Sequence, residues 1–173
     1  FVKRLRDRAP IPVFAVAKEP KKCKSSYAFD GQMAGTSGQS KRLEGIEMFI
    51  TGCPYSGGIQ YKTHIQDYGW ESGWTKNGEM SGTQGQAKRL EGICIELYGD
   101  VANYYDVYYR VHAQDIGWLS WASNGDPAGT AGRSARLEGI QIVLVPKGSP
   151  APGHRTVSRS FSCTPAPSAS PQR

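Results

Sequence analysis

This 173-residue chain contains no apolar run close to the roughly 18 residues that a membrane-spanning helix needs. Residues 141–145 are typical of its longest apolar stretches. We therefore expect no transmembrane segment. The chain begins at Phe1 and shows no apolar signal segment, so we expect a fragment or a mature form.

Residues that commonly hold metals are also scarce. The chain has four cysteines and three histidines, with no C-x-x-C pair and no regular spacing. We expect no metal site and no cofactor. Disulfides are possible, but the cysteines alone do not fix their pairing or the compartment. The residues concerned are Cys23, Cys53, Cys94, Cys163, His64, His112 and His154.

Basic charge is concentrated at the two ends of the chain. The formal net charge is +6, yet residues 25–145 carry nine basic and thirteen acidic residues. A nucleic-acid binder needs basic charge on its ordered surface, because phosphate contacts dominate its affinity. We therefore expect no nucleic-acid partner.

A 47-residue repeat is the main signal in the sequence. The string Arg-Leu-Glu-Gly-Ile begins at Arg42, Arg89 and Arg136. A Gly-Thr-x-Gly string precedes each copy, beginning at Gly35, Gly82 and Gly129. An Asp-Gly or Asn-Gly pair precedes each of these, at residues 30–31, 77–78 and 124–125.

Alternating apolar residues predict that each repeat is built from strands. In the third repeat, residues 107–113 alternate between apolar and polar types, as expected for a strand with one buried face. A short strand containing Trp118 should follow, and Asn124-Gly125 should close a hairpin. A glycine-rich loop should lead into a last strand, which buries Ile140, Ile142 and Leu144. Residues 102–105 are compatible with a helical turn.

The repeated arginine and glutamate should form ion pairs. By simple alternation they share the inward face with the following isoleucine, unless the glycine between them makes a bulge. We expect hydrogen-bonded pairs that are at least half buried and have a structural role. The pairs are Arg42 with Glu44, Arg89 with Glu91, and Arg136 with Glu138.

Three equivalent β units favour a closed pseudo-threefold arrangement. Three strands per unit, two of them long, favour a β-prism-like over a β-trefoil-like fold. We expect an all-β domain at residues 11–146, with repeats near 11–52, 53–99 and 100–146. Residues 1–10 should form a flexible basic segment, and the proline- and serine-rich residues 147–173 a disordered tail.

The third repeat resembles the clostridial hydrophobic repeat with a conserved tryptophan, the ChW repeat. The resemblance lies in Tyr-x-Val-His-x-Gln-Asp-x-Gly-Trp, Trp-x-x-Asn-Gly, Ala-Gly-Thr-x-Gly and Arg-Leu-Glu-Gly-Ile-x-Ile-x-Leu, between Tyr109 and Leu144. It covers about two-thirds of the chain, but residues 1–27 lack the Gly-Trp element. The resemblance implies a secreted or cell-surface module of Gram-positive bacteria that acts in adhesion or in binding carbohydrate or protein.

Aromatic and polar residues recur at matching positions in the second and third repeats. Trp74 and Trp121 are expected to pack in the core, with a structural role. Trp70 and Trp118 follow a glycine and could form partly exposed platforms for a sugar ring. The polar residues beside them could complete a binding patch or simply hydrogen-bond loop carbonyls. The candidate ligand-binding residues are Trp70, Trp118, His64, His112, Gln66, Gln114, Asp67 and Asp115.

No arrangement of these residues predicts catalysis. A His-Asp unit needs a nucleophile at a fixed geometry, and Ser72 and Ser120 lie in no nucleophile motif. We expect a non-catalytic, monomeric, secreted or cell-surface module that binds cell-wall or extracellular polysaccharide. Alternatives are a protein–protein docking domain and the targeting module of a cell-wall hydrolase.

Overall fold

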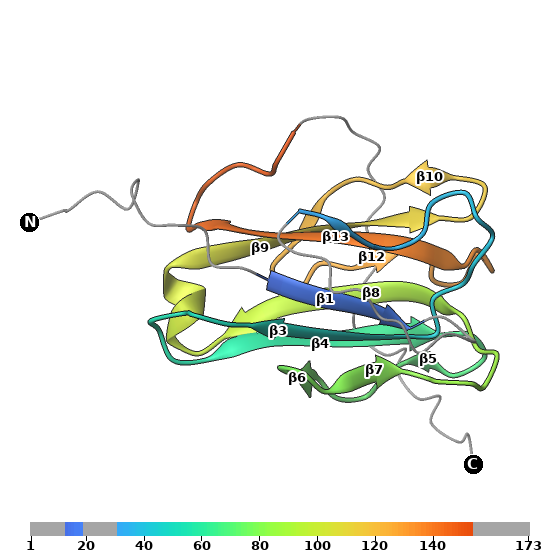
Figure 1. Ribbon diagram of the computed structural model, residues 1–173, viewed down its shortest axis with the longest axis horizontal. Coiled ribbons are helices and arrows are strands. Elements are labelled where there is room, and N and C mark those ends of the chain that lie inside the picture. The colour runs from blue at the N-terminus through green and yellow to red at the C-terminus, as the bar shows by residue number, and fades with distance from the viewer. Residues whose placement is uncertain (1–12, 19–30, 154–173) are drawn as a thin grey trace, which may run out of the picture.

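The computed structural model describes residues 13–18 and 31–153 (Figure 1). In this part of the chain, regular structure consists of β-strands and one short 3-10 helix, η2 (Asp100–Asn103). The all-β prediction is confirmed, and so is the helical turn expected near residue 102. The long strands run along the long axis of the molecule in Figure 1.

Each repeat contributes one antiparallel pair of long strands, and each pair belongs to a separate sheet. The pairs are β1 (Val13–Lys18) with β3 (Gly45–Ile50), β4 (Gly58–Ile65) with β8 (Leu90–Tyr98), and β9 (Tyr105–Ala113) with β13 (Leu137–Pro146). This arrangement of three sheets corresponds to the prism-like alternative.

Very short strands extend the outer edge of two of the sheets, because the chain after the first long strand folds back beside it. On β4 they are β5 (Gly69–Trp70) and β6 (Thr75–Lys76). On β9 they are β10 (Gly117–Trp118) and β11 (Ala122–Ser123).

The repeats exchange edge strands with one another. The residues just before and within each Gly-Thr string form β2 (Met33–Gly35), β7 (Met80–Gly82) and β12 (Ala128–Gly129). Strand β7 of the second repeat pairs with β3 of the first, and β12 of the third pairs with β8 of the second. Strand β2 of the first repeat pairs with β13 of the third, so the exchange closes into a ring.

This exchange corrects the predicted hairpin at the Asn-Gly pairs. The tight turn is present, since Asn124 and Gly125 both have positive φ and Asp126 N donates to Ser123 O at 2.9 Å. However, β11 before the turn pairs with β9, whereas β12 after it pairs with β8 of the neighbouring repeat. The turn therefore directs the chain from one sheet to the next.

We call the three boundaries between repeats the joints, and equivalent backbone hydrogen bonds stabilise each of them. The amides of Thr36, Thr83 and Thr130 donate to the carbonyls of Glu138, Glu44 and Glu91, over 2.8, 2.7 and 2.7 Å. Each bond joins a Gly-Thr string of one repeat to an Arg-Leu-Glu-Gly-Ile string of another. The two most regular motifs of the sequence therefore meet at the repeat boundaries.

The leucines of the Arg-Leu-Glu-Gly-Ile strings lie where the three repeats meet. Leu43 N donates to Leu137 O and Leu90 N to Leu43 O, both over 2.8 Å. These three side chains are at most 2% exposed. They belong to one core cluster with residues from every repeat.

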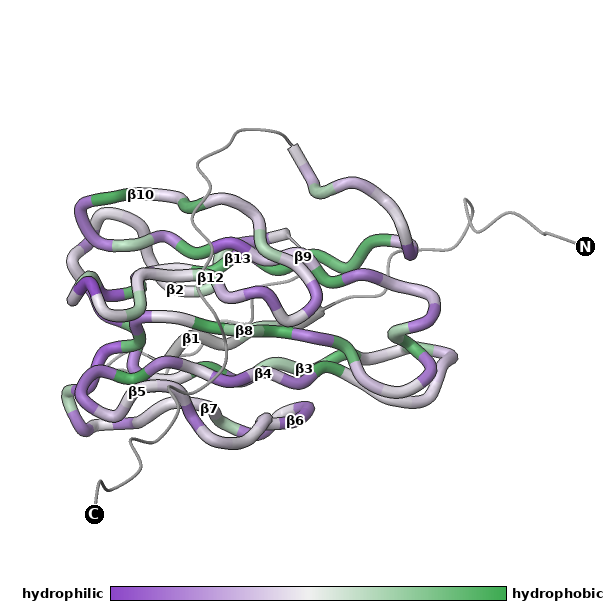
Figure 2. The backbone as a smooth tube through the Cα atoms, turned by 180° about the vertical axis from the view of Figure 1, so that it is seen from behind, coloured by the Kyte–Doolittle hydropathy of each residue, from purple (hydrophilic) through white to green (hydrophobic). Residues whose placement is uncertain are grey.

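The predicted inward faces are confirmed. Val107, Tyr109, Val111 and Ala113 are fully buried. Ile140, Ile142 and Leu144 are also buried, at no more than 4% exposed. Figure 2 shows hydrophobic residues along β8 and β9.

The predicted ends of the domain fall largely outside the described residues. Residues 1–10 and 154–173 of the expected flexible segments are not among them. The start of the expected tail is held to the domain, because Gly148 N donates to Asp106 Oδ2 at 2.7 Å and Lys147 Nζ lies 2.8 Å from Asp106 Oδ1. Ser149 O also accepts from the hydroxyl of Tyr108.

Candidate functional site

An Arg–Glu ion pair is present in every repeat. Arg42 Nε donates to Glu44 Oε1 over 2.8 Å, and Arg89 and Arg136 pair in the same way with the glutamate two residues on. The glutamates are 1–5% exposed, and the arginine side chains 21–36%. The predicted burial of these pairs is therefore observed.

The face that these charges occupy differs from simple alternation. The strand register shifts at Glu91 and Glu138, as it does at a β-bulge. The bulge lets Leu90 and Ile93 both point into the core, although they are three residues apart. The Glu91 carboxylate consequently lies beside His64, which alternates with the inward residues of β4.

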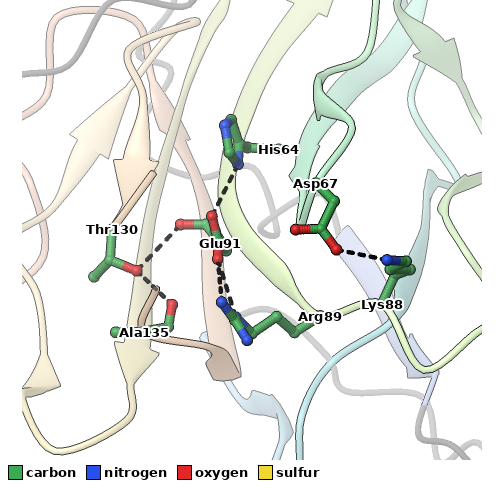
Figure 3. Close-up of polar contacts among 7 residues, drawn as sticks. All are labelled: His64, Asp67, Lys88, Arg89, Glu91, Thr130 and Ala135. Atoms are coloured by element: carbon green, nitrogen blue, oxygen red, sulfur yellow. Dashed lines mark hydrogen bonds and ion pairs between the residues drawn. The ribbon is translucent and has the colours of Figure 1, made fainter. Parts of the chain in front are cut away.

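Glu91 collects contacts from its own repeat and from the next (Figure 3). Its Oε1 lies 2.8 Å from Arg89 Nη2, and its Oε2 lies 3.4 Å from His64 Nδ1. The hydroxyl of Thr130, from the third repeat, donates to the Glu91 carbonyl and over 2.6 Å to the carbonyl of Ala135. Glu91 therefore stabilises a repeat boundary.

His64 is held mainly in its neutral form. Burial lowers its pKa below the ordinary value of 6.5, and the nearby Glu91 charge only partly opposes this effect. Its Nδ1 is buried without a hydrogen bond, although it lies 3.4 Å from the carboxylate. His112 Nδ1 stands at the same distance from Glu138 Oε2 and likewise has no hydrogen bond.

Trp70 and Trp118 cover these histidines. Trp70 lies opposite His64 in the β4–β5 pair, and the two rings meet edge to face with centroids 5.3 Å apart. Trp118 and His112 repeat this contact at 5.5 Å. A Cβ on Gly92 would lie 3.0 Å from the Trp70 ring. This close packing explains why the Arg-Leu-Glu-Gly-Ile string of the second repeat has glycine at this position.

The other two tryptophans lie on the same outer faces, beside cations. Trp74 and Trp121 are half-buried and lie outside the buried core in which we expected them. Lys62 Nζ is 5.1 Å from the Trp74 ring centroid. Arg110 Cζ lies 4.8 Å from the ring centroids of both Trp118 and Trp121. Each cation stabilises the stack by a cation–π interaction.

We call these two groups the repeat-2 cluster and the repeat-3 cluster. The repeat-2 cluster consists of Lys62, His64, Trp70 and Trp74. The repeat-3 cluster consists of Arg110, His112, Trp118 and Trp121. The corresponding part of the first repeat, residues 19–30, lies outside the described residues.

The cations were not foreseen from the sequence as part of the clusters. Lys62 and Arg110 occupy matching positions of the second and third repeats, two residues before the histidines. A basic residue recurring between aromatic positions was therefore an available signal. Their contacts with the indoles arise only when β5 and β10 fold back beside β4 and β9.

The predicted glutamines and aspartates lie at the turns that follow β4 and β9. Asp67 and Asp115 have positive φ and exposed side chains. Asp67 pairs with Lys88, Nζ to Oδ2, over 2.5 Å (Figure 3). The backbone N–H groups of Gln66 and Gln114 donate to the backbone carbonyls of Arg89 and Arg136.

These turns expose apolar side chains but do not join the clusters. Tyr68 is 62% exposed and Ile116, at the matching position, is 54% exposed. Of the predicted binding residues, His64 contacts Trp70 and His112 contacts Trp118. The structure gives no contact between those tryptophans and the turn aspartates in the described residues.

A buried hydroxyl network in the second repeat has a packing role. The Glu71 carboxylate accepts from the hydroxyls of Ser81 and Thr63 and from the amide of Gly82. The matching residues of the third repeat are Val111, Leu119 and Ala128, which are apolar. Apolar side chains fill the same place in the third repeat. The polar network of the second repeat therefore has the same packing role as apolar contacts have in the third.

Within residues 13–18 and 31–153, no cluster of histidine, cysteine and carboxylate side chains is placed to hold a metal ion. The helix in this part of the chain is too short to cross a membrane. Cys94 is disulfide-bonded, and Cys53 carries a free thiol.

Comparison with known proteins identifies the repeats. The family model described as clostridial hydrophobic W, ChW, matches residues 25–52, 64–99 and 112–146. Searches of curated proteins and of solved structures found no match. The matched segments hold the motifs that form the joints and the histidines and tryptophans of the two clusters, and they cover more than half of the chain; the chain belongs to the clostridial hydrophobic W repeat family.

Proposed function

We propose that this chain is a non-catalytic binding module that attaches to carbohydrate of a bacterial cell wall or extracellular matrix. The observation that carries the proposal is the recurrence of partly exposed indoles at matching places on two sheets. Trp70 and Trp118 each lie against a histidine on the outer face; Gly92 packs against the Trp70 ring, and Arg110 stacks on the Trp118 ring.

Such an indole suits a sugar ring. It offers a large apolar surface at low conformational-entropy cost, and its position is already fixed by the histidine. His64 and His112 would add polar contacts at the edge of the ring. Gln66, Gln114, Asp67 and Asp115 lie one turn away and are the weaker candidates.

Two similar sites also suit a polymeric ligand. Each shallow site would bind weakly, and engaging both on one polymer raises the overall avidity. A secreted or surface location fits this role, and the disulfide at Cys94 supports it because disulfides persist in oxidising compartments.

The test is co-sedimentation with purified Gram-positive cell walls, followed by isolated wall polysaccharide and surface-protein extract. Trp70→Ala and Trp118→Ala should each weaken retention on polysaccharide, and the double variant should abolish it. Asn103→Ala, an exposed change in η2, is the matched control and should bind as the parent does. Unchanged retention of the double variant would remove both indoles from the site.

Exposed apolar residues favour a second candidate, a protein-docking surface. Tyr68 and Ile116 occupy the same turn position in two repeats and are more exposed than any of the tryptophans. Binding only to the surface-protein extract, lost in a Tyr68→Ser and Ile116→Ser double variant, would favour this role over carbohydrate binding.

A further inference from the structure

We propose that the repeat-3 cluster recognises an acidic group on the polymer, a carboxylate or a phosphodiester, through Arg110. This inference rests on the proposed carbohydrate-binding function and names the chemical class of ligand. It follows from an unusual environment of one guanidinium group.

Arg110 differs from the three arginines of the Arg-Leu-Glu-Gly-Ile strings. Arg42, Arg89 and Arg136 each lie within about 3 Å of a buried glutamate. In contrast, Arg110 has no carboxylate within ion-pair distance among the described residues. Its Nε donates to the neutral amide oxygen Oε1 of Gln141 over 2.7 Å.

The guanidinium is nevertheless held in place. It lies between two indoles, 4.8 Å from each ring centroid, and the Gln141 bond fixes its rotation. An arginine fixed in this way has already lost much of its side-chain entropy. A planar guanidinium can also donate two parallel hydrogen bonds to a carboxylate or phosphate.

A second unsatisfied donor lies in the same cluster. The indole Nε1 of Trp121 is buried without a hydrogen-bond partner in the described part of the chain. Among the described residues, therefore, a cation without a counter-ion and an indole N–H without an acceptor lie side by side. Both would be satisfied by an oxygen-rich anion, once a small shift of the indole edge admits it.

The repeat-2 cluster is less suited to this role. Lys62 replaces Arg110, is only 8% exposed, and has a compact ammonium group in place of the planar fork. Cys94 stands where Gln141 does in the third repeat. We therefore assign recognition of the acidic group to the third repeat.

The experiment titrates the folded protein with three polymers and follows binding by calorimetry and by tryptophan fluorescence. The probes are polygalacturonate for the carboxylate, poly(glycerol phosphate) for the phosphodiester, and neutral dextran. Binding of at least one acidic polymer should weaken tenfold or more in Arg110→Gln, and its dependence on salt should fall. Arg110→Lys should keep part of the affinity. The acidic polymer bound more tightly identifies the source of the anion.

The control is Lys76→Gln, which removes another cation stacked on an aromatic ring, 4.9 Å from that of Tyr98. It should bind like the parent, and thermal unfolding should show that every variant is folded. Equal affinity of Arg110→Gln and parent for the acidic polymers would overturn the anion site while leaving carbohydrate binding intact. Failure of all three polymers and of wall polysaccharide to bind would instead contradict the proposed function.

Discussion

The backbone amide of Thr83 donates to the carbonyl of Glu44 over 2.7 Å, across the boundary between the first and second repeats. Gly45 and Gly82 face each other at this point, and a Cβ on Gly82 would collide with the Glu44 carbonyl oxygen. The same contact recurs at the other two boundaries. Conformationally free glycines and backbone hydrogen bonds across the boundaries therefore help to hold the three repeats in one ring.

The glycines at the joints should not tolerate a side chain. Gly82 has φ of +99°, and a Cβ there would lie 2.5 Å from the Glu44 carbonyl oxygen. We expect Gly82→Ala to lower the free energy of unfolding by at least about 2 kcal/mol in a denaturant titration. Gly73→Ala is the matched control, because nothing lies within 4 Å of that position and its φ is not positive. Equal stability of the two variants would refute the close approach.

Two ion pairs that lie close together in Figure 3 should differ in their contribution. Arg89→Met leaves the buried Glu91 carboxylate facing only a neutral histidine, so we expect a loss of roughly 2–3 kcal/mol in the free energy of unfolding. Lys88→Met removes the exposed pair with Asp67 and should leave the unfolding midpoint unchanged within error. Similar losses in both variants would contradict the assigned burial.

Acid should destabilise the fold partly through His64. Its pKa is lowered by burial, so the unfolded chain takes up a proton more readily than the folded protein does. The contribution is present above pH 6.5 and is lost as the pH falls toward the lower, folded pKa. Stability measured between pH 5 and 8 should fall less steeply with acid in His64→Asn. Identical slopes for parent and variant would exclude this histidine as a source.

Two buried tyrosines should ionise only at a pH well above that of an exposed tyrosine. Burial raises the pKa of Tyr61 to about 12 and that of Tyr109 further still. Their hydroxyls donate to the backbone carbonyls of Glu79 and Asp126, and that of Tyr61 also accepts from Met48 N over 2.9 Å. In a phenolate absorbance titration, Tyr61→Phe should remove a step near pH 12. Because the raised pKa favours the protonated form in the fold, stability should fall as the pH rises above 10. A parent in which all tyrosines titrate near pH 10 would contradict this environment.

The repeat and its strand faces could be predicted because they are local patterns. Alternation placed Val107 and Ile140 inward correctly, and the 47-residue period predicted three equal units. The exchange of β7 onto β3 could not be predicted, since a strand of three residues carries no periodicity and its partner belongs to another repeat. Each joint requires a glycine with positive φ, but the sequence shows only that a glycine recurs there and does not indicate its backbone conformation.

The part of the candidate site that depends on local patterns could also be predicted from the sequence. The pairing of Trp118 with His112 follows from a two-residue strand beside a long one, and both residues had been singled out. The outward position of Trp121 and the stacking of Arg110 depend on how the intervening loop folds. Alternation along the chain gives no information about that loop.

Closure of the ring is measured most directly by hydrogen exchange at the amides of Thr36, Thr83 and Thr130. Thr83 and Thr130 join repeats that are adjacent in sequence, whereas Thr36 N reaches Glu138 O and joins the first repeat to the third. We predict slow exchange at all three, with similar protection factors. Fast exchange at Thr36, with Thr83 and Thr130 protected, would show an open stack of repeats and contradict the closed arrangement.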